Sequence, residues 1–275
     1  MCQGRYETTL CSRSVTGCHG EGTLVTGFAQ ESAPVRAPSI TDPPSLVDIA
    51  VTTLRRMIIG GQLLSGQRIV ENRLTSELGI SRPPLREALR ILEREGLVRQ
   101  EPRKGVSVTE LSLHDLYEIV TLRREFERLA VRLALPVDEP SRLRRCHDAV
   151  RDMIAAADRG DEPAFSEGSC RFHVALVGLS GNRRLEDAYR SLQLQLMLGM
   201  ALTRTPRAKQ ALLEDLHRHE RLLRVVEQGQ ADTVLAELAR HDERDFLDGI
   251  ESKVDGHTEM ARQWLRRERA STEEA

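Results

Sequence analysis

The sequence predicts a mainly α-helical protein, with a winged helix-turn-helix followed by an all-helical bundle of six to seven helices. Two observations carry this prediction. Apolar residues recur at helical spacing through most of residues 45–270, with glycines and prolines between the periodic stretches. Two short apolar runs flank a basic turn at residues 101–105 and are typical of a β-hairpin. The 275 residues are enough for two ordinary domains.

Composition excludes several classes of protein. Hydrophobic residues make up 40% and charged residues 30%, as in a globular chain. No apolar run approaches the roughly 18 residues of a membrane span, so no membrane partner is expected. The net charge of −2 means that any nucleic-acid surface must be local, and 3% aromatic residues argue against a stacking platform for single strands. The five cysteines indicate no disulfide framework and no secretory signal is seen, so we expect a cytoplasmic protein.

We divide the chain into a tail at residues 1–43, a winged helix-turn-helix at 44–110 and a helical domain at 111–270. The tail is rich in Gly, Ser and Thr, lacks periodicity and is interpreted as disordered. Its cysteines and histidine fit no compact zinc motif. A translation start downstream of Met1 is an alternative explanation for this segment.

The second segment begins with three predicted helices. The first runs from Leu46 to Ile58 and stops at a glycine pair, and the second is short and ends at Gly79. The third begins with Ser81 as its expected N-cap and carries two prolines in its first turn, where missing N–H groups cost little. Strands are expected at residues 97–100 and 106–109. Three helices and a hairpin in this order predict a winged helix-turn-helix.

The third helix is the one that would enter a DNA major groove. Arginines recur along it at every fourth position, and the arginine fork suits the O6 and N7 atoms of guanine. The tip of the hairpin is basic and can approach a minor groove or the DNA backbone. A solvated helix face is the alternative interpretation of the arginine row. The predicted DNA-contacting residues are Ser81, Arg82, Arg86, Arg90, Lys104 and Gly105.

The third segment is predicted to be helical throughout. A capping box at Ser112 and Asp115 opens its first helix, which ends before Pro136. Glycines and prolines separate the helices that follow. The expected ranges are about 112–135, 141–158, 163–179, 183–202, 206–229 and 231 onward, with a break near residue 256.

Three histidines of this segment are candidate metal ligands. His219 and His241 lie 22 residues apart, about ten residues on either side of the turn expected at Gly229. Two antiparallel helices joined there would bring both imidazoles to the same height. His173 from another helix would complete a three-nitrogen site inside a bundle. Each histidine could equally be a surface residue or a hydrogen-bonded core residue.

The segment Gly79-Ile80-Ser81-Arg82-Pro83-Pro84-Leu85-Arg86-Glu87-Ala88-Leu89, followed by Glu95-Gly96-Leu97-Val98, resembles the GntR family of bacterial transcription regulators. The helical segment after it resembles the FCD effector-binding domain of the FadR-like branch. Ser65 stands where the family usually has proline, and Pro83 where a small polar residue is common. The resemblance implies DNA contacts at the residues given above, a homodimer on a near-palindromic operator, and control by a small metabolite.

The resemblance also implies a divalent metal held by one aspartate and three histidines. His173, His219 and His241 match the histidines, but the aspartate position is occupied by Ser169. A hydroxyl is a weaker ligand than a carboxylate, so Cys170, water or the carboxylate of the effector could occupy the fourth position, or the metal could be lost. Three imidazoles favour zinc.

Two further residues are candidate effector contacts. Arg123 matches a position where members of this branch often carry arginine, and it could clamp a carboxylate or form a surface salt bridge with Glu127. Asn182 is expected to cap the next helix first and to contact ligand second. Gln193 and Gln195 lie in an apolar helix and are possible lining residues.

The leading functional prediction is therefore a sequence-specific transcription regulator, a repressor by the commonest family logic, whose operator binding responds to a small carboxylate. A metal-dependent enzyme using the three histidines is the alternative. It lacks a catalytic motif such as His-Glu-x-x-His, a phosphate loop and a nucleophile elbow. A structural DNA-binding protein without ligand is a third possibility, which a dedicated helical domain disfavours.

Overall fold

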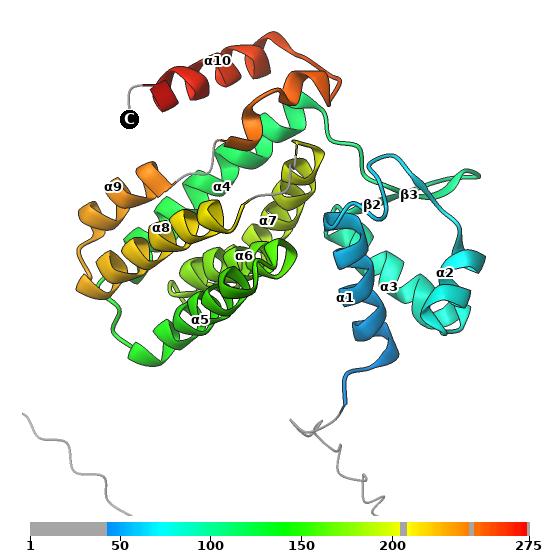
Figure 1. Ribbon diagram of the computed structural model, residues 1–275, viewed down its shortest axis with the longest axis horizontal. Coiled ribbons are helices and arrows are strands. Elements are labelled where there is room, and N and C mark those ends of the chain that lie inside the picture. The colour runs from blue at the N-terminus through cyan, green and yellow to red at the C-terminus, as the bar shows by residue number, and fades with distance from the viewer. Residues whose placement is uncertain (1–42, 204–207, 242–244, 274–275) are drawn as a thin grey trace, which may run out of the picture. The chain divides into compact units, whose positions relative to one another are not determined.

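The computed structural model describes residues 43–203, 208–241 and 245–273 (Figure 1). This part of the chain is mostly helical with one small sheet, which confirms the predicted fold class. The predicted tail lies outside the described residues, except for residue 43. None of the described helices is long and apolar enough to cross a membrane.

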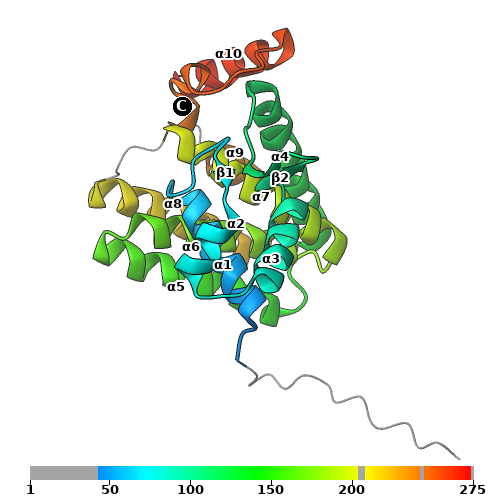
Figure 2. The ribbon, with the colours of Figure 1, turned by 90° about the vertical axis from the view of Figure 1, so that its right-hand side faces the viewer.

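The N-terminal helices and strands form the expected winged helix-turn-helix (Figures 1 and 2). The strands are antiparallel in the order β1-β3-β2, with Ile69 opposite Val106 and Val98 opposite Val108. β1 was not predicted because two residues are too short for a period-two signal. The elements are α1 (Leu46–Ile59), β1 (Arg68–Ile69), α2 (Glu71–Leu78), α3 (Arg82–Arg94), β2 (Val98–Glu101) and β3 (Gly105–Val108).

One predicted helix cap is confirmed in its position but lacks the capping hydrogen bond. Ser81 occupies the N-cap position of α3, but its side chain makes no capping hydrogen bond. An N-cap oxygen normally accepts from the backbone N–H of the second or third helical residue. In α3 those residues are Pro83 and Pro84, which have no N–H. The Ser81 hydroxyl therefore has no helical donor to accept from and lies at the exposed start of α3.

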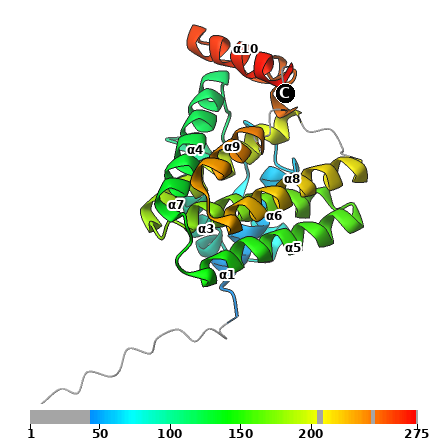
Figure 3. The same ribbon diagram turned by 90° about the vertical axis from the view of Figure 1, so that its left-hand side faces the viewer.

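Seven α-helices follow the wing in the described residues. A turn at Gly229 joins α8 to α9, and the two helices lie side by side (Figures 1 and 3). The helix predicted to begin at Pro206 begins at Lys209 instead, and residues 204–207 lie outside the described part. The helices are α4 (Leu113–Ala134), α5 (Leu143–Arg159), α6 (Glu162–Gly178), α7 (Arg183–Thr203), α8 (Lys209–Gln228), α9 (Ala231–His241) and α10 (Glu259–Glu273). Short 3-10 turns occupy Pro140–Arg142, Asp245–Leu247 and Ile250–Ser252.

Helix α6 lies inside the bundle, in contact with α4, α5, α7 and α8. Its side chains Phe165, Phe172 and Val177 are completely buried, as is Tyr189 of α7. Such residues contribute about 1.5–3 kcal/mol each relative to an exposed side chain. Because α6 is surrounded, its polar residues Ser169 and His173 are buried with the apolar ones.

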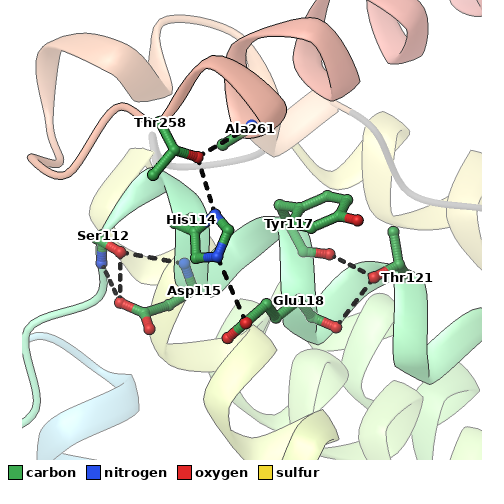
Figure 4. A network of polar contacts seen from close by, with 8 residues as sticks. All are labelled: Ser112, His114, Asp115, Tyr117, Glu118, Thr121, Thr258 and Ala261. Carbon is green, nitrogen blue, oxygen red and sulfur yellow. Dashed lines mark hydrogen bonds and ion pairs between the residues drawn. The ribbon is translucent and has the colours of Figure 1, made fainter.

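Helix α10 and the residue before it contact α4. His114 Nδ1 lies 2.9 Å from Thr258 Oγ1, beside the capping box that Ser112 and Asp115 form (Figure 4). Further along α4, Arg124 donates two hydrogen bonds to Glu268 at 2.6 and 2.7 Å. These contacts hold α4 in place, and α4 carries the buried side chain of Arg123.

Candidate metal centre and nucleic-acid interface

The structure brings His173 of α6, His219 of α8 and His241 of α9 together. One ring nitrogen of each lies within 4.8 Å of the others, and all three side chains are buried. His173 Nε2 and His241 Nε2 are 3.3 Å apart. The turn at Gly229, with φ of 75°, reverses the chain between α8 and α9 and sets the rings of His219 and His241 4.3 Å apart, centroid to centroid.

Two carboxylates hold the outer nitrogens of this cluster. Glu127 Oε1 lies 2.9 Å from His173 Nδ1. His219 Nδ1 lies 2.9 Å from the Asp215 carbonyl oxygen and 3.3 Å from its carboxylate. Because these partners accept hydrogen bonds, each Nδ1 carries the proton and each Nε2 keeps its lone pair. This tautomer is the one that binds a metal through Nε2.

The protonation of the site also suits metal binding. Burial lowers the pKa of His173, although its hydrogen bond to Glu127 opposes the shift. Burial lowers the pKa of His241 well below its usual value. Burial alone would raise the pKa of Glu127, but Arg123 and His173 outweigh it and lower that pKa to about 2. The imidazoles of His173 and His241 are therefore neutral and Glu127 is ionised at neutral pH.

The surface salt bridge considered for Arg123 is not observed, because Arg123 is 5% exposed. Its Nη1 lies 3.9 Å from Glu127 Oε1 and 3.4 Å from Gln193 Oε1. Tyr189 donates to the same Glu127 oxygen at 2.6 Å, and burial raises the pKa of its hydroxyl. Arg123 thus belongs to a buried polar network that reaches His173 through Glu127.

Asp215 and Tyr189 were not predicted as site residues, and Glu127 was predicted only as a partner for Arg123. A signal existed for two of them. Glu127 is one helical turn after Arg123, and Asp215 is one turn before His219, a spacing at which helical side chains meet. Tyr189 gave no comparable signal, because its partner Glu127 is 62 residues away in the sequence.

The two side chains considered for the fourth metal-ligand position, Ser169 and Cys170, have different surroundings in the structure. Ser169 Oγ lies 3.0 Å from His219 Nε2, so its hydroxyl belongs to the cluster. Cys170 was a wrong candidate, because it packs against apolar core residues outside the histidine cluster. It lines a pocket with Arg55 and Arg190. Burial raises the pKa of the Cys170 thiol to about 11, which keeps it protonated. Neighbouring helical residues point about 100° apart, so Ser169 and Cys170 cannot both face the histidines.

Two other polar candidates have structural contacts. Asn182 Oδ1 accepts a hydrogen bond from the Leu185 backbone N–H at 3.2 Å, as expected for a cap of α7. Gln193 joins the network of Arg123, whereas Gln195 donates to the backbone oxygen of Glu95 at 3.3 Å. Gln195 is therefore not a lining residue of the histidine cluster.

The predicted DNA-contacting side chains lie on the exposed surface of the winged helix-turn-helix. Arg82 donates to Asn72 and Arg86 to Glu71, whereas Arg90 pairs with Glu87 of its own helix. At the wing, Lys104 lies 2.7 Å from Glu101, and Gly105 has φ of 89°, which favours glycine. The two parts of the predicted surface are the start of α3 and the β2–β3 turn.

The winged helix-turn-helix is a DNA-binding fold that places its third helix in a major groove. Residues 47–108 match the model of bacterial regulatory proteins of the gntR family, and residues 118–244 match the FCD domain. The chain belongs to the GntR family and carries an FCD domain after its winged helix-turn-helix.

Named relatives agree with this assignment. The chain is 35% identical over 135 residues to the uncharacterized HTH-type transcriptional regulator YdhC of Bacillus subtilis, covering 49% of this chain and 60% of YdhC. It is 32% identical over 134 residues to an uncharacterized HTH-type transcriptional regulator of Agrobacterium vitis, covering 48% of this chain and 78% of that protein. The chain thus spans less than two thirds of the length of YdhC.

Two longer matches extend the comparison. The gluconate operon transcriptional repressor of Bacillus licheniformis is 28% identical over 212 residues, covering 74% of this chain and 82% of the repressor. The solved structure of E. coli McbR/YncC superposes with a TM-score of 0.63 at 23% identity, covering 76% of this chain and 96% of that one. This second similarity shows a shared fold.

Proposed function

We propose that this protein is a sequence-specific DNA-binding transcription regulator whose operator binding is controlled by a small carboxylate in the helical domain. The observation that carries the proposal is the exposed start of α3. There Arg82, Arg86 and the uncapped Ser81 hydroxyl share one surface. Arginine forks suit guanine edges, and a hydroxyl beside a helix N-terminus suits phosphate. Relatives named as transcription regulators support the same function.

Within this proposal, His173, His219 and His241 hold a zinc ion. Two nitrogen ligands of a tetrahedral zinc, each at about 2.0–2.1 Å, lie roughly 3.4 Å apart. The 3.3 Å between the Nε2 atoms of His173 and His241 fits this spacing. Outward hydrogen bonds to Glu127 and Asp215 orient two of the ligands. The bound ion would supply a positive charge that attracts an anionic ligand.

A carboxylate is the effector class that best matches this site. Imidazole and hydroxyl ligands bring no negative charge, so the three histidines and Ser169 leave the charge of a divalent ion uncompensated. A carboxylate oxygen can supply the missing negative ligand. The name of the gluconate operon repressor makes sugar acids suitable first probes. Arg123, whose guanidinium faces Glu127, is a candidate second contact for the carboxylate. We propose repression as the mode of regulation.

Regulation is favoured over metal-dependent catalysis by the positions of the two nearby carboxylates. A hydrolytic metal site needs a general base beside an open metal position. Glu127 and Asp215 instead contact the outer nitrogens of His173 and His219. These contacts orient the ligands, and neither carboxylate belongs to the group of ring nitrogens that lie within 4.8 Å of one another.

The function is tested with purified full-length protein and a random double-stranded DNA library. Selection is expected to enrich a near-palindromic duplex, and Arg86→Ala is expected to lose guanine preference at one position of each half-site. Gluconate and simple mono- to tricarboxylic acids are then titrated into the complex with zinc-loaded and chelator-treated protein. We expect at least one acid to release DNA from the zinc-loaded form alone. A protein that enriches no sequence contradicts the proposal.

A homodimer would cover an exposed apolar stripe on α4. Leu122, Leu129 and Leu133 are 47%, 43% and 55% exposed and lie on one face of the helix. A second copy also supplies the second DNA-reading head that a near-palindromic operator requires.

Leu129→Glu is expected to convert the dimer to a monomer, because the new carboxylate would be buried without a partner. Light scattering coupled to size-exclusion chromatography measures the mass directly. Ile154→Glu on α5 is the matched control, since Ile154 is 39% exposed but lies outside the stripe. A Leu129→Glu protein that remains dimeric at micromolar concentration would place the interface elsewhere.

A further inference from the structure

The arginine row of α3 divides into two groups with different partners. Arg86 Nε donates to Glu71 Oε2 at 2.9 Å, and Arg82 Nη2 donates to Asn72 Oδ1 at 3.1 Å. The acceptors are consecutive residues in the first turn of α2. Arg90 and Arg94, in contrast, both pair with Glu87 of α3 itself. Only the two arginines at the start of α3 are therefore tied to a neighbouring helix.

The contact with Glu71 leaves the end of the Arg86 guanidinium available. It uses Nε, and among the described residues the structure gives no acceptor for Nη1 or Nη2. Those two nitrogens are the donors of an end-on arginine, the geometry that pairs with O6 and N7 of guanine. Arginine loses considerable rotamer entropy when it binds. A side chain that is already held loses less of that entropy on meeting a base.

The charge of Glu71 works against DNA binding in general. A carboxylate beside a surface that meets phosphates repels them and lowers the affinity for any duplex. Glu71 is 29% exposed and its partner Arg86 is 61% exposed, so both remain accessible to DNA. The carboxylate should therefore weaken binding to all sequences while improving the choice among them. A change that raises affinity for all sequences but lowers discrimination among them therefore indicates that Glu71 orients Arg86. A change in general electrostatic attraction alone would leave the discrimination unchanged.

We propose that Glu71, assisted by Asn72, is a positioning residue for base recognition. Glu71 holds Arg86 so that its terminal nitrogens meet one guanine of the half-site, and its charge disfavours DNA that lacks this base. Asn72 orients Arg82 in the same way without adding charge. The inference rests on the proposed DNA-binding function of α3.

The test compares full-length wild type, Glu71→Gln and Glu77→Gln. Glu77 is the matched control because it lies on the same helix and pairs with Arg73 at 2.6 Å, away from α3. Both substitutions remove one negative charge from α2. Each protein is selected against a random double-stranded library. It is then titrated with the enriched duplex, the single-base variants of that duplex and a scrambled duplex at one salt concentration, since these affinities depend on salt.

For Glu71→Gln we expect tighter binding to the scrambled duplex and about tenfold less discrimination at one guanine position of each half-site. Glu77→Gln should change both affinities by the same factor and leave the base preference intact. Arg86→Ala should remove preference at the same position, and adding Glu71→Gln to it should change that preference no further. Asn72→Ala should weaken discrimination at a different position, the one that Arg82 reads.

A Glu71→Gln protein with the base preference of the wild type overturns the inference. An equal loss of base discrimination in Glu71→Gln and Glu77→Gln overturns it as well. If Glu71→Gln does not fold, Asn72→Ala decides, and an unchanged profile for that variant is the negative result. A wild type that enriches no sequence contradicts the proposed function itself. If the wild type enriches a motif and the variants prefer the same bases at every position, only the positioning role is contradicted.

Discussion

His219→Ala is expected to abolish specific zinc binding. The substitution removes one of three imidazoles whose nitrogens lie within 4.8 Å of one another. Loss of an outer contact to a zinc ligand typically weakens binding 10–100-fold, and loss of the ligand itself should exceed this. Native mass spectrometry of protein prepared without chelator measures the ion count per chain. We expect one zinc-sized ion in the wild type and none in the variant.

The thermal stability of the same proteins gives an independent measurement. A ligand present at about a thousandfold its Kd stabilises the folded state by about 4 kcal/mol. Zinc should therefore raise the melting temperature of the wild type by several degrees and leave His219→Ala unchanged. The comparison is made with and without zinc for each protein, because the loss of a buried ring also lowers stability by itself.

His217→Ala is the matched control for the zinc experiment. His217 lies on α8, two residues before His219, but its side chain is exposed. It should keep the zinc ion and the zinc-dependent shift in melting temperature. Retention of a tightly bound ion by His219→Ala would contradict the proposed metal centre.

Glu127→Ala is expected to destabilise the fold by about 3–5 kcal/mol, the typical cost of breaking a buried ion pair from one side. The carboxylate lies 2.9 Å from His173 Nδ1, accepts from Tyr189 at 2.6 Å and faces the Arg123 guanidinium. Removing it takes the counter-charge away from a buried cation. Glu127→Gln keeps the shape of the side chain but not its charge, so its stability should lie between those of the wild type and Glu127→Ala. Urea unfolding followed by circular dichroism measures the difference.

The effect of Glu127 should depend on pH in a defined direction. Its pKa is about 2 in the folded protein, below the ordinary value of 4.5 that applies when the chain is unfolded. The ionised carboxylate therefore stabilises the fold fully above pH 4.5, and this contribution is lost as the pH falls toward 2. The stability gap between wild type and Glu127→Gln should narrow over that range.

Glu125→Ala is the control for Glu127. Glu125 lies on the same helix but is exposed, and its partner Arg128 is exposed as well. Surface ion pairs of this kind contribute about 0–1 kcal/mol. If Glu125→Ala and Glu127→Ala were equally destabilising at pH 7, the buried network would not have the role assigned to it.

Much of the fold could be predicted because helix periodicity and helix breakers are local properties. The three helices and hairpin of the DNA-binding segment lie within a residue or two of their expected positions. Gly229 and the 22-residue spacing also indicated that His219 and His241 would meet across a turn. The strand β1 escaped prediction because a two-residue pairing is specified by β3 and not by its own sequence.

The failures at the sites have a common physical origin. Ser81 was expected to cap α3, but whether a cap bond forms depends on donors, and prolines at the receiving positions supply none. Ser169, at the aspartate position, and its neighbour Cys170 were both candidates for the fourth ligand position. Only Ser169 faces the histidines, because the packing of the bundle fixes which side of α6 is turned toward them. Spacing along a helix gives relative directions but not the absolute direction of a side chain.

The sequence by itself determined the helix pattern, the order of the two domains and the residue types available for DNA and metal. The tertiary structure decided which of these residues meet. Glu127 and His173 are 46 residues apart, and His173 and His241 are 68 residues apart. Contacts over such separations depend on how whole helices pack, and packing is fixed by the combined burial of many side chains. No local pattern in the chain contains that information.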